Sequence, residues 1–183
     1  MPDYDFKSLS PWEFEQLSRD LLRASLGLDF ELFKSGRDQG IDLRYSNSKN
    51  NNVIAQCKHY ANSRFSNLKS NLKNNEYEKI VKLSPRRYIL VTSLGMTPGN
   101  KEDISEILGK YLLSFSDIVT RETLNRWLGD YPNIEKSHIK LWATTSAIME
   151  RIIHSGYRGQ VLRFAFDLFW ALSDFIIGRL AGR

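Results

Sequence analysis

The chain has 183 residues, of which 42% are hydrophobic, so it can form one domain core with a short appendage. Its net charge of +5 favours polyanionic partners, because each Lys or Arg placed on a phosphate releases condensed counterions. The single cysteine, Cys57, excludes an intrachain disulfide and a cysteine-based zinc site, and without the apolar core of a signal peptide at the start we expect a cytoplasmic location.

The first third of the chain predicts a helix followed by three strands. Ser10-Pro11-Trp12-Glu13 has the pattern of a capping box with proline at the first helical position, so we expect a helix that runs to about Leu26 and ends at Gly27. Strand-like runs follow at 30–33, 40–45 and 53–60. Short strands in this order predict an antiparallel meander.

Helices and strands alternate in the next part of the chain. The pattern predicts a helix over 65–83, a buried strand over 87–92, a helix over 98–113, a short strand over 117–119 and a helix over 121–128. This order predicts an α/β fold with a mixed central sheet flanked by helices.

The character of the sequence changes after Tyr131. Two helical patterns, 139–153 and 161–180, predict a helical C-terminal extension over 132–183, which leaves 1–131 as the main domain. The second pattern is rich in Phe, Leu and Ile but carries charges such as Arg163 and Asp167. Because charges at mid-bilayer cost several kcal/mol, we expect no membrane span.

Three polar residues on the second and third predicted strands form a candidate site. Gln56 and Lys58 are two residues apart, so they project from one face of their strand, and Asp42 shares this face if the two strands pair as a hairpin. A carboxylate, an amide oxygen and an ammonium would then converge on one point.

This convergence has a chemical meaning. Mg²⁺ prefers hard oxygen ligands, which Asp42 and the backbone carbonyl of Cys57 could supply. Lys58 would then lie beside a metal-bound water that it could orient or deprotonate. Together these parts would be sufficient for metal-assisted hydrolysis of a phosphodiester.

The neutral Gln56 leaves the two strands with only one acid for the ion. Glu15, at the edge of the apolar stripe of the first helix, can make up this deficit. The alternative is equally open, because an acid on an amphipathic helix is most often simply solvated.

At these residues the chain resembles the Mrr type of the PD-(D/E)xK nucleases, in a variant with Gln where an acid usually stands. The matching segments are LSPWEFEQLSRDLL, GRDQGIDLRY, VIAQCKHY and RYILVTS, with Asp38-Gln39-Gly40 in place of the usual Asp-Gly-Gly. The resemblance implies a restriction-endonuclease-like core arranged αβββαβ. It also implies a DNA endonuclease of the type IV restriction kind in bacterial defence, dependent on Mg²⁺ or on Mn²⁺ in its place.

The resemblance also implies residue roles. It assigns catalytic roles to Asp42, Gln56, Lys58 and Glu15, and metal binding to Asp42, Glu15 and the carbonyl of Cys57. Basic residues around this site are interpreted as DNA contacts that position the phosphate backbone, although a charged helix face is more often only solvated. These candidate DNA contacts are Lys34, Arg37, His59, Lys69 and Lys73.

Later segments point to partners. NKEDISEIL and IEKSHIKLWATTSAIMERIIHSG resemble the N-terminal nuclease domains of large bacterial antiphage NTPases of the STAND type, which implies an NTPase module or partner. Cutting both DNA strands commonly needs two active sites, so a homodimer or higher oligomer is also expected. The alternative function is a catalytically silent DNA-binding or assembly module, because a fold does not guarantee activity.

Overall fold

A computed structural model describes residues 2–32, 43–46, 52–60 and 63–142. The chain divides into two units, Met1–Leu141 and Trp142–Arg183, and the fold below is that of the first. The helical patterns expected at 139–153 and 161–180 lie outside the described residues, except for the short helix α7 (Ile139–Trp142). None of the described helices is long and apolar enough to cross a membrane.

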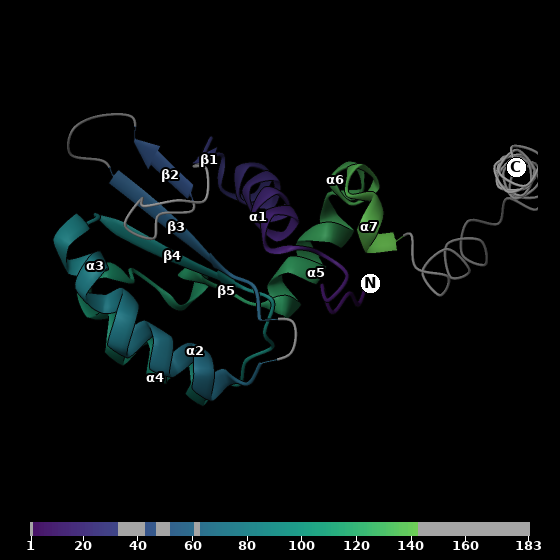
Figure 1. Ribbon diagram of the computed structural model, residues 1–183. Coiled ribbons are helices and arrows are strands. Elements are labelled where there is room, and N and C mark those ends of the chain that lie inside the picture. The colour runs from purple at the N-terminus through teal and green to yellow at the C-terminus, as the bar shows by residue number, and fades with distance from the viewer. Residues whose placement is uncertain (1, 33–42, 47–51, 61–62, 143–183) are drawn as a thin grey trace, which may run out of the picture. The chain divides into compact units, whose positions relative to one another are not determined.

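Among the described residues, the strands form one mixed sheet of five strands in the order β1-β2-β3-β4-β5 (Figure 1). β1 (Glu31–Leu32), β2 (Leu43–Ser46) and β3 (Asn52–Lys58) pair antiparallel, as the meander predicted. β4 (Arg87–Thr92) pairs with β3 in parallel, and β5 (Ile118–Val119) pairs with β4 in parallel. The expected mixed α/β fold is therefore confirmed.

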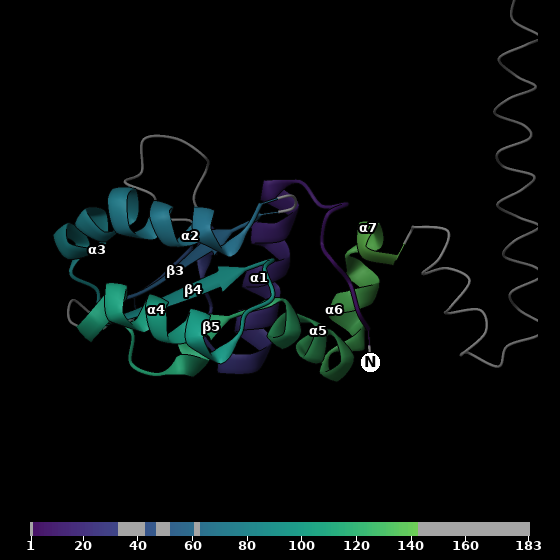
Figure 2. The ribbon, with the colours of Figure 1, turned by 90° about the horizontal axis from the view of Figure 1, so that it is seen from below.

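Helices pack on both faces of this sheet (Figure 1, Figure 2). One face carries α2 (Phe65–Asn71), the π-helical turn η1 (Leu72–Glu76), α3 (Tyr77–Leu83) and α4 (Pro98–Leu108). The other face carries α1 (Pro11–Leu26), which contacts β1, β3 and α5 (Arg121–Asp130). Short 3-10 turns at Gly109–Tyr111 and Phe115–Asp117 connect α4 to β5.

The first helix begins and ends where the sequence predicted. The Ser10 side chain accepts a hydrogen bond from the backbone of Glu13, and the Glu13 side chain accepts one from the backbone of Ser10, which completes the capping box. Gly27 ends the helix with a left-handed backbone (φ 66°) and donates to the carbonyl of Arg23. A side chain at this position would strain the turn.

The helix expected over 65–83 is interrupted by a wider turn. The helical segment runs without a break, but the five residues Leu72–Glu76 between α2 and α3 form a π-helical turn. The buried residues of the whole segment are Leu68, Leu72, Glu76 and Ile80, at intervals of four. One of these four residues is an acid.

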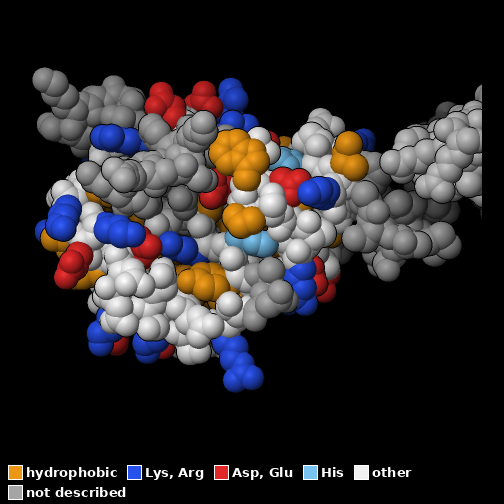
Figure 3. All heavy atoms as spheres, viewed as in Figure 1, with side chains coloured by type: hydrophobic (Ala, Val, Ile, Leu, Met, Phe, Trp, Pro, Cys, Tyr) orange, Lys and Arg blue, Asp and Glu red, His pale blue; other side chains and the backbone are white. Residues whose placement is uncertain are grey.

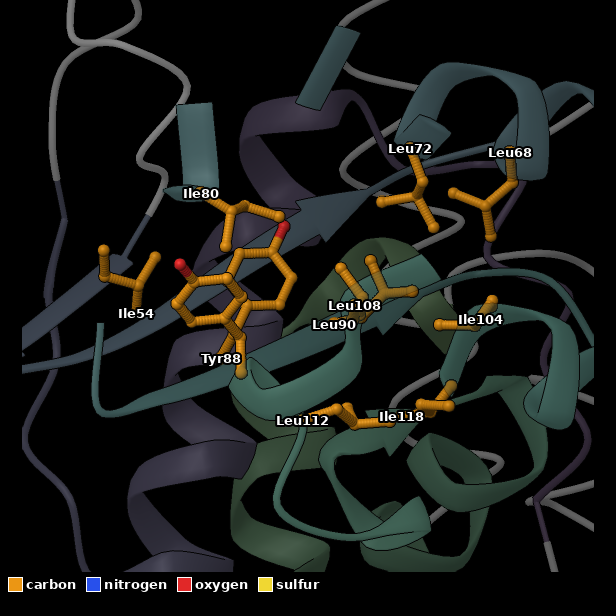
Figure 4. Packing of buried hydrophobic residues seen from close by; sticks show 11 residues of the cluster. Ile54, Leu68, Leu72, Ile80, Tyr88, Leu90, Ile104, Leu108, Leu112 and Ile118 are labelled. Carbon is orange, nitrogen blue, oxygen red and sulfur yellow. The ribbon is translucent and has the colours of Figure 1, made fainter. Parts of the chain in front are cut away.

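The core on this face joins strands and helices. Ile54, Tyr88 and Leu90 project from β3 and β4 into one cluster with Leu68 and Leu72 (Figure 4). All five are almost fully buried. Burial of this kind stabilises the fold by about 25 cal/mol per Å² of apolar surface. The core therefore holds α2 and α3 firmly over the strand that carries Gln56 and Lys58.

The compact unit continues past residue 131. α6 (Pro132–Ser137) contacts α5 and α1. The imidazole Nε2 of His138 lies 3.0 Å from Oδ2 of Asp20, and Lys140 forms an ion pair of 2.7 Å with Glu13, both on α1. The first part of the expected extension thus packs on the main domain, and a separate role for the remainder stays a prediction.

Candidate active site

β3 brings Gln56 and Lys58 together on the face under α2 and α3. In the parallel ladder Gln56 pairs with Leu90 and Lys58 with Thr92, so both side chains project to the face of the apolar core described above. Gln56 is only 2% exposed, whereas the Lys58 side chain, at the end of the strand, is 18% exposed. The lysine therefore lies where the buried face meets solvent.

A residue not singled out from the sequence, Glu76, joins these two. Lys58 donates from Nζ to Oε1 of Glu76 over 2.9 Å, and Gln56 donates from Nε2 to Oε2 over 3.0 Å. The ammonium of Lys79, one helical turn further on, lies 3.4 Å from both carboxylate oxygens. The signal that could have identified Glu76 was present, since an acid stands in the apolar stripe of its helix.

The environment of Glu76 keeps its carboxyl group ionised. Burial raises the pKa of Glu76, but hydrogen bonds from Gln56 and Lys58 and the charges of Lys58 and Lys79 outweigh it and lower the pKa below its ordinary value. The pKa of the nearby Tyr60 phenol is raised, because burial and the negative charge of Glu76 both disfavour its ionised form. A fixed negative charge thus lies under the end of β3.

The hydrogen bonds also fix the orientation of the Gln56 amide. An ionised carboxylate can only accept, so the NH₂ group of Gln56 must face Glu76. The amide oxygen then faces Tyr88 on β4, whose hydroxyl donates to it. The amide oxygen expected to converge on one point with Asp42 and Lys58 is therefore engaged with Tyr88.

The predicted residues on the other face of the sheet form a different group. The His59 ring packs on Phe14 of α1, with 5.0 Å between ring centroids, and its Nε2 lies 3.0 Å from the carbonyl oxygen of Phe6. Cys57 is buried on the same face, and half-buried Glu15 lies on α1. The roles predicted for Glu15, for the Cys57 carbonyl and for His59 in DNA binding stay predictions.

Three predicted site residues, Asp42, Lys34 and Arg37, lie outside the described residues. Leu43, which follows Asp42 in the sequence, is the first described residue of β2 and pairs with Ala55 on β3. The role of Asp42 stays a prediction.

Basic side chains cover the outside of α2 and α3, and Figure 3 shows several of them at the left of the view. Lys69 is engaged in an ion pair of 2.8 Å with Asp103. Lys73 and Lys82 are exposed and form no ion pair with another described side chain. These two are the better placed to meet a polyanion.

The donor set fits a hard divalent ion only in part. Within the described ranges, no three His, Cys, Asp or Glu side chains come together to hold a metal ion. Glu76 is an ionised oxygen donor beside Lys58, which is the chemistry that Mg²⁺ prefers. The described side chains therefore supply only part of such a ligand set.

A mixed sheet with helices on both faces and a Gln-x-Lys pair on its central strand is consistent with a restriction-endonuclease-like fold. Residues 6–107 match the family model of the Mrr catalytic domain, described as restriction endonuclease, and the chain belongs to this family. The family is one of nucleases.

The comparison with curated proteins gives a relative without an assigned activity. The uncharacterized protein y4cD of Sinorhizobium fredii is 43% identical over 155 residues, which is 85% of this chain. The chain spans 24% of the length of that relative. No solved structure matches the chain at a significant level.

Proposed function

We propose that this chain is a metal-dependent endonuclease that hydrolyses phosphodiester bonds of double-stranded DNA, foreign or modified, in bacterial defence. The observation that carries the proposal is the ammonium of Lys58, held at the end of β3 by buried Glu76 beside Gln56. Membership of the restriction endonuclease family supports a nuclease. Asp42 precedes Leu43, whose partner Ala55 is next to Gln56, and this adjacency supports a role for Asp42 at the same place.

Different residues of the chain would bind the metal ion, orient the water and hold the DNA. Asp42 and the Cys57 carbonyl would hold Mg²⁺ or Mn²⁺, which when bound supplies a Lewis acid and an activated water, whereas Glu15 lies on α1, at the face of the sheet opposite Lys58. Lys58 would orient this water and offset the charge that develops on the phosphoryl oxygens. Lys73, in the π-helical turn η1 between α2 and α3, would hold the DNA backbone without reading its sequence.

Plasmid cleavage tests this proposal. Supercoiled DNA is incubated with the purified chain in Mg²⁺, in Mn²⁺ and in EDTA. We expect nicking or linearisation in both metals and none in EDTA. Asp42→Ala and Lys58→Ala should each abolish cleavage, with folding checked by circular dichroism because Lys58→Ala leaves Glu76 buried without its nearest cation.

A matched control uses a lysine far from the site in sequence. Lys110→Ala removes an exposed lysine that lies over the Tyr111 ring, and this variant should cut at the wild-type rate. Wild-type chain that binds DNA but does not cut it in any divalent ion would replace the proposal with the silent DNA-binding module. Cleavage at the wild-type rate by folded Lys58→Ala would also overturn it.

The chain's partners are part of the proposal. Because the chain spans 24% of a relative 43% identical to it, we infer that it acts with a larger module, with an NTPase of the STAND type as the expected one. A second copy of the chain would supply the second active site for cutting both strands. Light scattering at the concentrations where plasmid is linearised measures the oligomeric state of the chain. A monomeric mass at all of these concentrations would count against the dimer.

A further inference from the structure

Glu76 is an acid in a place where its helix is otherwise apolar. It is 6% exposed, between the buried residues Leu72 and Ile80, and it lies in the π-helical turn that joins α2 to α3. Burying a carboxylate is costly unless it is paired and hydrogen-bonded. π-Helical turns frequently occur at functional sites. The combination indicates a role beyond packing.

The contacts of Glu76 converge on the Gln-x-Lys pair. Each carboxylate oxygen of Glu76 accepts a hydrogen bond from one residue of this pair: Oε1 from Lys58 at 2.9 Å and Oε2 from Gln56 at 3.0 Å. The Lys58 side chain is 18% exposed, so one end of the network is accessible to a substrate while the other is closed. Tyr88 closes the network by donating to the Gln56 oxygen.

We propose that Glu76 is a positioning residue of the active site, which holds the Lys58 ammonium at the end of β3 and requires a hydrogen-bond donor at position 56. This inference rests on the proposed nuclease function and adds a residue to it. It gives a physical reason for Gln56. A carboxylate at this position would face the Glu76 carboxylate across the 3.0 Å that a hydrogen bond now spans, and two ionised carboxylates at this distance repel.

The role assigned to Gln56 follows from the same network. With its NH₂ group on Glu76 and its oxygen on Tyr88, Gln56 acts as a spacer that orders the carboxylate. The acid that pairs with Lys58 is then Glu76, which comes from the helix and not from the strand. Gln56 works through Glu76, and Glu76 through Lys58.

The first test removes the charge of Glu76 and keeps its shape. Glu76→Gln should lower kcat for plasmid cleavage about 10–100-fold, the usual cost of losing a partner that orients a site residue, while KM for DNA changes little. Glu76→Asp keeps the charge and should recover part of kcat. Loss of structure alone would instead reduce the active fraction equally in both variants.

Asp117→Asn provides the matched control. Asp117 is fully buried and accepts from Arg87 at the start of β4, so this variant also removes a buried carboxylate paired with a basic residue. It should lose stability but keep kcat per folded molecule. Folded Glu76→Gln with wild-type kcat would overturn the inference and leave the proposed function standing.

A second measurement does not depend on cleavage. In ¹⁵N-labelled protein, the ammonium signal of Lys58 should be protected from exchange with water in the wild type and lost in Glu76→Gln. The side-chain amide signals of Gln56 should shift in Glu76→Gln and in Tyr88→Phe. If the wild type cuts no DNA in any metal, the proposed function fails. These signals then still decide whether Glu76 positions Lys58, and unchanged signals would refute it.

Discussion

The substitution Gln56→Glu provides a quantitative test of the carboxylate network. It places an acid on the strand about where the Gln56 amide now donates to the Glu76 carboxylate over 3.0 Å. The pair can avoid this repulsion by binding one proton. Protonating a carboxyl with an ordinary pKa of 4.5 at pH 7 costs about 3 kcal/mol, at 1.36 kcal/mol per pH unit. Because Lys58 and Lys79 offset part of the repulsion, we expect a loss of about 2–3 kcal/mol.

The pH dependence of this loss has a definite sign. In folded Gln56→Glu the carboxylate pair keeps a proton, whereas in the unfolded chain the glutamate loses it above its ordinary pKa of 4.5. The loss of folding stability therefore grows as the pH rises above 4.5 and vanishes near 4.5. In the wild type the lowered pKa of Glu76 has the opposite effect. Its stabilising contribution is present above pH 4.5 and is lost as the pH falls through the lowered value.

Urea unfolding of the wild type and Gln56→Glu at pH 7 and pH 4.5, followed by circular dichroism, measures the penalty of the substitution and its pH dependence. The double variant Gln56→Glu with Glu76→Gln is the control, because it exchanges acid and amide and restores one donor facing one acceptor. It should unfold close to the wild type at pH 7. A Gln56→Glu penalty that is equal at the two pH values would refute the electrostatic reasoning, since a packing defect does not titrate.

Two further predictions concern other parts of the domain. Arg87→Met leaves Asp117 buried without its cation and should lower the free energy of unfolding by about 3 kcal/mol, measured in urea, with no such loss in a variant of an exposed arginine such as Arg86→Met. Lys73→Gln and Lys82→Gln should each weaken DNA binding to all sequences alike and reduce the slope of log affinity against log salt by about 1, if each contacts one phosphate as proposed. An unchanged salt slope in both variants would show that the DNA lies elsewhere.

Much of the fold could be predicted from local sequence signals. The capping box at Ser10 and the left-handed Gly27 are local, and they gave both ends of α1. The apolar run over 87–92 gave β4 with its observed bounds. Such features depend on residues close in sequence, so no knowledge of tertiary packing is needed.

The network around Glu76 could not be derived in the same way. The spacing of Gln56 and Lys58 places both on one face of a strand, but nothing in that spacing tells which helix covers this face. The partner comes from twenty residues further on and depends on the register between β3 and α2–α3. Glu76 was an exception within an apolar pattern, and its meaning appears only when the polar residues beneath it are known.

The π-helical turn links this site to the packing of the domain. Leu68 and Ile80 are twelve residues apart. In a regular α-helix twelve residues make three full turns and about 120° more, so the two side chains could not both face the sheet. The wider turn at Leu72–Glu76 absorbs about one residue, or about 100°, and returns Ile80 to the face of Leu68. The same turn keeps Glu76 pointing at β3. The feature that lets α2 and α3 share one core therefore also delivers the acid to Lys58, so the stability of this layer and the geometry of the site have one structural cause.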